Sequence, residues 1–84
     1  MNQRGDFEAA LEQRGISIYW FESEDDEGNR WAMFHLIKVD GDVGATLDGS
    51  AQLVDSVDRV EMLVEMVESQ LDRELEKQRR LARS

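Results

Sequence analysis

The first apolar residues of the chain are spaced as they are in a helix. Phe7, Ala10 and Leu11 recur among polar neighbours and would share one face of a helix over residues 3–13. Gly15 follows directly and suits the left-handed conformation in which many helices end. We therefore expect a short N-terminal helix of about three turns.

Two runs that follow are rich in β-branched and aromatic side chains, which are typical of strands. They are residues 16–22 (ISIYWFE) and residues 30–39 (RWAMFHLIKV), and the polar stretch 23–29 (SEDDEGN) between them contains Gly28 and Asn29. This order predicts an antiparallel hairpin with a long acidic loop.

A turn at residues 40–44 (DGDVG) precedes a short third strand that we expect over residues 43–47. A long helix then begins near residue 50, with Asp48 or Ser50 as its N-cap. We expect its last turns, residues 76–84, to protrude or fray. Apolar residues at steps of three and four form a stripe about 80° wide on this helix: Leu53, Val57, Val60, Val64, Val67, Leu71 and Leu75.

Side chains alternate along a strand, so a hairpin that pairs Phe21 with Trp31 sorts its residues onto two faces. One face holds Ile16, Ile18, Trp20, Ala32, Phe34 and Leu36. The other holds Ser17, Tyr19, Phe21, Trp31, Met33, His35 and Ile37. We expect the long helix to cover the first face. The short helix would be too short to cover the second fully, although that helix and the third strand together could still wrap it. If it is uncovered, the face has the composition of an interface, and its candidate contact residues are Tyr19, Phe21, Trp31 and Met33.

These elements predict one small α+β domain over residues 1–84. It would have a short N-terminal helix, an antiparallel hairpin or three-stranded sheet, and a long amphipathic C-terminal helix on one sheet face. The chain has no cysteine, which excludes disulfides and thiolate metal sites. It lacks both a signal-like start and a run of about 18 apolar residues. We therefore expect a cytoplasmic protein that does not enter a membrane.

Charge makes this domain a candidate binding protein. The chain carries 19 acidic and 10 basic residues, a net charge of −9, and most of the excess acid lies in residues 40–71. A field of this sign repels nucleic acid and anionic membranes and favours basic protein surfaces. We therefore expect a partner protein with a basic surface, and no direct contact with nucleic acid.

Carboxylates form a second stripe on the predicted long helix, beside the apolar one. Neighbours are one turn apart over about 27 Å, close to the charge density of a nucleic-acid strand, so a groove that binds DNA or RNA could accept them. The alternative is a solvated face that keeps the domain soluble. Like charges one turn apart destabilise a helix, however, and only Arg59 and Arg73 lie near enough along it to relieve them. The stripe consists of Asp58, Glu61, Glu65, Glu68, Asp72 and Glu76.

Two further features are candidates for partner contact. Met62 and Met66 lie opposite the apolar stripe and next to the acids, where exposed methionines suit an adaptable contact or a helix-to-helix dimer. The spacing of acids in the hairpin loop does not match a calcium-binding loop, so we expect no metal there, and an ordinary solvated loop is the alternative. The acids of this hairpin tip are Glu22, Glu24, Asp25, Asp26 and Glu27.

Groups that could carry catalysis are scarce. His35 is the single histidine, and its position in a strand favours a structural role over general-base duty. The sequence contains no Gly-rich phosphate loop, nucleophile elbow or paired metal-ligand motif. We therefore expect a protein that is not an enzyme and takes no cofactor.

The acid-lined helix over residues 58–72, the acidic tip over residues 22–27 and the small size resemble the acidic inhibitors of phages and mobile elements. Anti-CRISPR and DNA-mimic anti-restriction proteins are of this kind, and the resemblance includes no shared motif. It implies inhibition of a bacterial defence complex by occupation of its Lys/Arg-lined nucleic-acid site, in the host cytoplasm if the protein is phage-encoded. One alternative is an antitoxin or immunity protein that neutralises a basic toxin. Another is a homodimeric structural or assembly module formed through Tyr19, Phe21, Trp31, Met62 or Met66.

Overall fold

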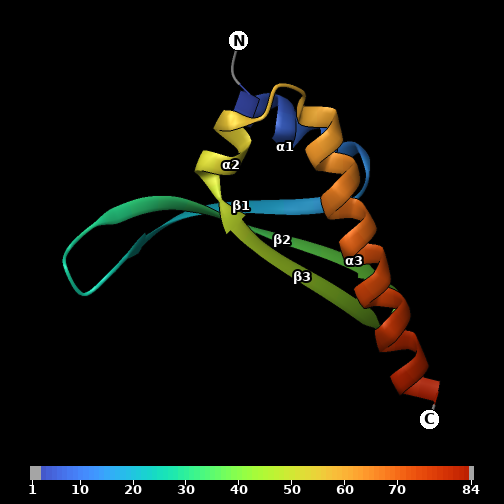
Figure 1. Cartoon of the computed structure of the whole chain (residues 1–84). Coiled ribbons are helices and arrows are strands. Elements are labelled where there is room, and N and C mark those ends of the chain that lie inside the picture. The colour runs from blue at the N-terminus through green and yellow to red at the C-terminus, as the bar shows by residue number, and fades with distance from the viewer. Residues whose placement is uncertain (1–2, 84) are drawn as a thin grey trace.

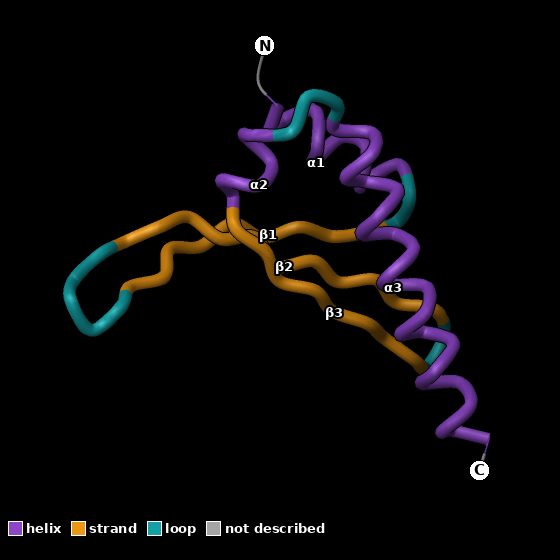
Figure 2. Tube along the Cα trace, viewed as in Figure 1, coloured by secondary structure: helices purple, strands orange, loops and turns teal. Residues whose placement is uncertain are grey.

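A computed structural model describes residues 3–83 as a three-stranded sheet with helices against it (Figure 1). The strands form one antiparallel sheet in the order β1-β2-β3 (Figure 2). The predicted α+β fold, with a C-terminal helix packed on the sheet, is confirmed. No helix within residues 3–83 is long and apolar enough to cross a membrane. The elements are α1 (Gln3–Gln13), β1 (Ile16–Glu24), β2 (Arg30–Asp40), β3 (Val43–Ser50), α2 (Ala51–Ser56) and α3 (Val60–Arg83).

Helix α1 begins and ends where the apolar spacing predicts. Phe7 and Leu11 are its fully buried residues. The backbone N–H of Gly15 donates to the carbonyl of Glu12 at 3.1 Å, and Gly15 has a φ of +72°. A residue with a Cβ adopts that conformation only at a steric cost, so glycine ends the helix here and turns the chain into β1.

The hairpin pairs with a register two residues away from the predicted one. Phe21 lies opposite Met33, and Trp31 lies opposite Ser23, so the predicted Phe21–Trp31 pair is wrong. A shift of two residues leaves every side chain on its original face. The two predicted faces of the hairpin therefore remain as the sequence indicates.

Asp25 explains why β1 extends two residues further towards the tip than predicted, whereas β2 begins at Arg30 as predicted. Its backbone N–H donates to the carbonyl of Asn29 at 3.0 Å, and its carboxylate accepts from the N–H groups of Glu27 and Asn29, both at 2.9 Å. The hydrogen bond from the Asn29 side chain, more than any other contact, holds the pKa of Asp25 below its usual value. Asp25 and Asn29 thus close a short loop that replaces the seven-residue loop expected over residues 23–29.

The long helix predicted from residue 50 is interrupted, so it forms α2 and α3. Ser50 caps α2 as predicted, because its side chain accepts from the N–H of Gln52 at 3.2 Å. Val57 is extended, with φ −77° and ψ 145°, and its carbonyl accepts from the side chain of Gln3 at 2.5 Å. The Ser56 hydroxyl also donates to a backbone carbonyl of α2, a contact typical of serine at helix ends. The helix therefore stops at Ser56 and restarts at Val60.

This break changes which residues of the apolar stripe are buried. Val60, Val64, Val67, Leu71 and Leu75 are buried as predicted. Leu53 is 42% exposed, which contradicts its place in the stripe, whereas Val54 and Leu63 are buried without having been predicted. The segment over residues 76–84 is helical as far as Arg83, and residue 84 lies outside the described residues.

All three helices lie on one face of the sheet (Figure 1). The core between them surrounds Phe34, whose ring makes edge-to-face contacts with Phe7 and Trp20 at centroid distances of 5.4 and 6.0 Å. The alternative in which the first helix wraps the second face is wrong, because Phe7 and Leu11 join the same buried cluster as α3. A chain of this size buries too little surface for two cores, and the second face stays open.

Helices α1 and α2 are joined by a bidentate ion pair. The Arg4 guanidinium donates to both carboxylate oxygens of Asp55, at 2.8 and 3.0 Å. This hydrogen bonding, more than the Coulomb attraction, lowers the pKa of Asp55 and raises that of Arg4.

Replacing Asp55 with asparagine is expected to lower stability only where the carboxylate is ionised. Because the folded pKa is depressed, the stabilisation is fully present above the ordinary value of 3.8 and is lost as pH falls through the folded pKa. Urea unfolding of wild type and Asp55→Asn from neutral pH to about pH 2 checks this expectation. Asp26→Asn, which removes an exposed acid at the hairpin tip, is the control. If the difference in the free energy of unfolding between wild type and Asp55→Asn stayed constant down to the lowest pH, this expectation would be wrong.

Candidate protein-binding surfaces

The acidic stripe predicted for the long helix is only partly continuous. Glu61 and Glu65 are exposed one turn apart on α3, while Asp58 lies in the connection before the helix begins at Val60. Glu61 is in the first turn, where a negative charge interacts favourably with the helix dipole. The predicted exposure of Met62 and Met66 is confirmed, at 65% and 49%. We call this set the outer surface of α3: Asp58, Glu61, Met62, Glu65 and Met66.

Basic side chains from other elements neutralise the second half of the stripe. Lys38 on β2 places its Nζ 2.7 Å from the carboxylate of Asp72 and 4.0 Å from that of Glu68. Arg14, just after α1, also reaches Glu68 at 3.4 Å. The prediction that only Arg59 and Arg73 could relieve the stripe is therefore wrong.

The last member of the stripe is paired as well. Glu76 contacts Arg79 and Arg80 within the same helix, at 3.8 and 3.4 Å. Arg79 also binds Asp40 at the end of β2, which ties the later turns of α3 to the sheet. Among residues 3–83, Asp58, Glu61 and Glu65 have no cation within salt-bridge distance. The unneutralised charge of the stripe is therefore concentrated at the start of α3.

Some acids of the hairpin tip make side-chain contacts that hold the loop, and the others are exposed. The Asp25 carboxylate accepts hydrogen bonds from Asn29 that close the loop, and the Glu24 carboxylate pairs with Arg30 at 3.7 Å. Glu22, Asp26 and Glu27 are exposed. The tip lies at the opposite end of the molecule from the C-terminal half of α3 (Figure 1).

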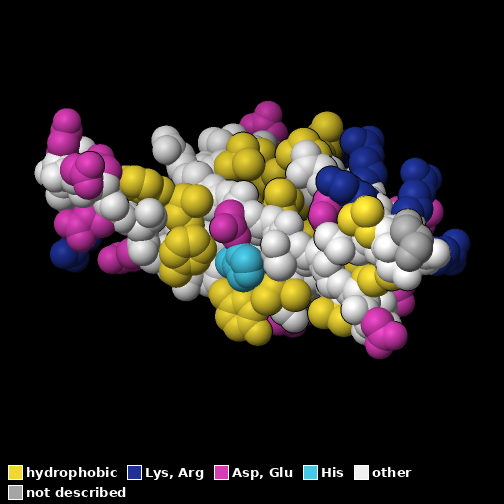
Figure 3. Space-filling view, turned by 90° about the horizontal axis from the view of Figure 1, so that it is seen from below, with side chains coloured by type: hydrophobic (Ala, Val, Ile, Leu, Met, Phe, Trp, Pro, Cys, Tyr) yellow, Lys and Arg dark blue, Asp and Glu magenta, His cyan; other side chains and the backbone are white. Residues whose placement is uncertain are grey.

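The face of the sheet that the helices leave uncovered carries several exposed apolar side chains. Its exposed apolar side chains include Tyr19 at 58%, Phe21 at 43%, Trp31 at 40% and Val39 at 65%. Figure 3 looks onto this side and shows hydrophobic side chains around the single histidine. We call it the open sheet face, and the strand register assigns to it Ser17, Tyr19, Phe21, Ser23, Trp31, Met33, His35, Ile37, Val39, Gly44, Thr46, Asp48 and Ser50.

Strand β3 adds residues to this face that the sequence analysis missed. Asp48 lies opposite His35, and its carboxylate contacts the Nδ1 of that histidine. Thr46 lies opposite Ile37 in the next row. The sequence prediction ended this strand at residue 47, so neither Asp48 nor the row that it completes was placed on the sheet. The alternation of Val43, Ala45 and Leu47 was the signal available, and extending it would have found them.

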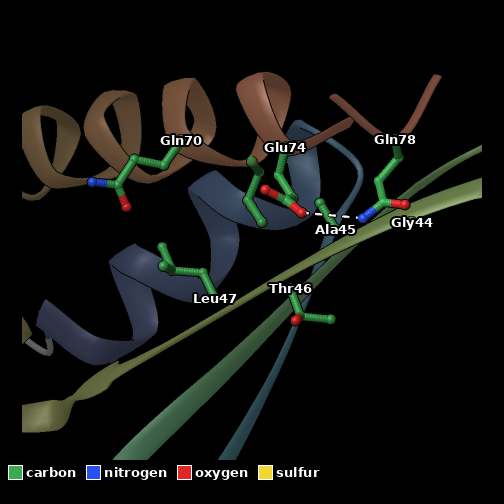
Figure 4. A pocket seen from close by; sticks show the side chains of 8 residues that line it. Gly44, Ala45, Thr46, Leu47, Gln70, Glu74 and Gln78 are labelled. Atoms are coloured by element: carbon green, nitrogen blue, oxygen red, sulfur yellow. Dashed lines mark hydrogen bonds between the residues drawn. The ribbon is translucent and has the colours of Figure 1, made fainter. Parts of the chain in front are cut away.

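A groove of about 340 Å³ runs between the edge strand β3 and helix α3 (Figure 4). Gln70, Glu74 and Gln78 line its helix side, and the Gln78 amide donates to the Glu74 carboxylate at 3.1 Å. Ala45 and Leu47 of β3 line the other side. Its polar groups are half-exposed or exposed, which is the character of a wetted surface groove and not of a desolvated catalytic site.

No protein-family model matches this chain, and no curated protein or solved structure gives a significant match.

Proposed function

We propose that this protein acts by binding, and that the outer surface of α3 contacts a basic surface on a partner protein. The observation that carries this proposal is the uneven neutralisation of the acidic stripe. Glu68, Asp72 and Glu76 have cations at 2.7–4.0 Å, whereas Glu61 and Glu65 have none among residues 3–83.

Two like charges one turn apart on a helix cost a few tenths of a kcal/mol in the free protein. A partner that supplies lysine or arginine removes that repulsion and gains charge-assisted hydrogen bonds. Met62 and Met66 lie between and beside these acids and add apolar area that adapts to the partner. The surface therefore suits a partner with both basic and apolar side chains.

Inhibition of a nucleic-acid-binding defence protein is the narrower form of this proposal. On the helix, Glu61 and Glu65 are separated by a rise of about 6 Å, the spacing of about two phosphates along one strand. They would replace a short phosphate contact and not a long duplex. An antitoxin or immunity protein would use the same surface against a basic toxin, so the identity of the captured partner decides between them.

Capture from a bacterial lysate tests the proposal with two matched variants. Glu61→Gln/Glu65→Gln removes two charges from the outer surface of α3, and Glu22→Gln/Glu27→Gln removes two from the hairpin tip. We expect wild type and the tip variant to retain the same basic protein, and the α3 variant to lose it by about tenfold or more. The retained protein should be displaced by an oligonucleotide, and also by raising salt from about 50 to 500 mM.

Equal retention by wild type and the α3 variant would refute the role of this surface. If only the tip variant failed to retain the captured protein, the contact would lie at the hairpin, and this result would also contradict the proposal. All four substituted positions are exposed, so we expect each variant to keep the fold. Circular dichroism of each variant checks this.

A further inference from the structure

The molecule is more open than a monomer of its size. A compact protein of 9.7 kDa exposes about 5,100 Å², whereas this chain exposes 5962 Å². Its radius of gyration of 14.3 Å likewise exceeds the value of about 12 Å expected for a compact chain of this length. The excess surface is close to the roughly 800 Å² that each partner buries in a standard interface.

The charge of the open sheet face differs from that of the rest of the protein. The chain has a net charge of −9, yet His35 and Asp48 are the only ionisable groups among the open-face residues other than the Tyr19 phenol, and they contact each other. A face whose one carboxylate already contacts a histidine offers little electrostatic attraction to a basic protein. When this face meets a copy of itself in a two-fold interface, each copy brings a single carboxylate.

We propose that the open sheet face binds the same face of a second copy, which gives a dimer with two sheets in the middle and helices outside. Sheets packed in this way lie about 10 Å apart and bury the side chains of both inner faces. Tyr19 and Phe21, exposed in the monomer, lie in the middle rows of the interface, where aromatic side chains contribute most, and Trp31 lies in the row nearest the hairpin tip. The outer surface of α3 remains free on each side, because it lies across the sheet from this face.

The distribution of side-chain size supports a self-complementary fit. Bulky Tyr19 and Phe21 lie on β1, whereas β3 presents the small side chains of Thr46 and Ser50. A two-fold axis parallel to the central strand β2 sets β1 of each copy against β3 of the other. Tyr19 then lies opposite Asp48 of the second copy, where its hydroxyl can donate to that carboxylate.

Sedimentation equilibrium of wild type and two variants tests the dimer. Tyr19→Lys places a charge on the open sheet face, and Met62→Lys makes the same change at a similarly exposed apolar residue of α3. Each substitution lowers the net negative charge, so weaker association cannot come from greater overall repulsion. Over about 5 to 200 µM we expect wild type and Met62→Lys to form dimers, and Tyr19→Lys to raise the dissociation constant about 30-fold or more.

The dependence on salt concentration distinguishes this dimer from binding of a partner at α3. Raising the salt concentration screens repulsion between two chains of charge −9 and should strengthen the dimer, whereas it weakens contact with a basic partner. A wild-type protein that stays monomeric at every concentration overturns the proposal. Dissociation by Met62→Lys without dissociation by Tyr19→Lys also overturns it, because it would place the interface on α3. Thr46→Lys, on β3 of the same face, replaces Tyr19→Lys if that variant does not fold.

Discussion

Replacing Phe34 with alanine is expected to lower the free energy of unfolding by about 3–5 kcal/mol. Its ring is 1% exposed and lies between Phe7 and Trp20 at the centre of the core. The substitution removes the buried area of the ring and two edge-to-face contacts, and it leaves a cavity that the surrounding sheet and helices can only partly fill. A chain of this length has a total stability of about 4–13 kcal/mol, so the substitution should remove a large share of it.

Urea denaturation followed by circular dichroism measures this loss, with Leu53→Ala as the control. The sequence pattern places Leu53 in the buried stripe, but the structure leaves it 42% exposed, so its truncation should cost well under half as much as that of Phe34. Similar losses for the two variants would contradict the break between α2 and α3. A loss below about 1 kcal/mol for Phe34→Ala would contradict its place in the core.

Replacing Gly49 with alanine is expected to destabilise the protein by about 1–3 kcal/mol, although alanine normally stabilises a strand relative to glycine. Gly49 lies opposite Phe34 on β3, and an added Cβ would be 2.3 Å from the Cζ of that ring. The ring cannot move away easily because Phe7 and Trp20 pack against it. The absence of a side chain at residue 49 is therefore what gives Phe34 its space.

A double-mutant cycle checks this cause, again by urea unfolding. Leucine at position 34 lacks the ring atoms that an alanine at 49 would meet, so Phe34→Leu/Gly49→Ala should cost at least about 1 kcal/mol less than the sum of the single changes. Gly44→Ala is the matched control on the same strand, since its Cβ would approach other atoms no closer than 3.8 Å. Additive costs in the cycle, or equal costs at the two glycines, would show that the Phe34 ring is not the obstacle.

Much of the local structure could be predicted because its causes are local to the chain. The spacing of Phe7 and Leu11, followed by Gly15, specifies a helix and its end within a few residues. Alternation along β1 and β2 sorted their side chains correctly onto two faces even though the register was wrong by two residues, since a strand repeats with a period of two. The role of Asp25 in closing the hairpin involves its own neighbours but competes with several other possible turns, and it was missed for that reason.

The candidate surfaces depend on contacts between distant parts of the chain. Lys38 neutralises Asp72 across 34 positions of sequence, and Arg14 reaches Glu68 from the turn after α1, so no pattern within the helix could show which acids remain unpaired. The break at Val57 likewise accompanies packing of α2 on α1, where Gln3 binds the Val57 carbonyl.

The sequence by itself determined the element types, the two faces of the hairpin and the net charge of −9, because these follow from residue identity and from spacing over one or two turns. Only the tertiary structure decided that all three helices share one face, that the other face stays open with Asp48 as its single carboxylate, and that the free acids lie at the start of α3. The reason is physical: burial and charge pairing depend on which elements meet, and a core this small joins every helix to one side of the sheet.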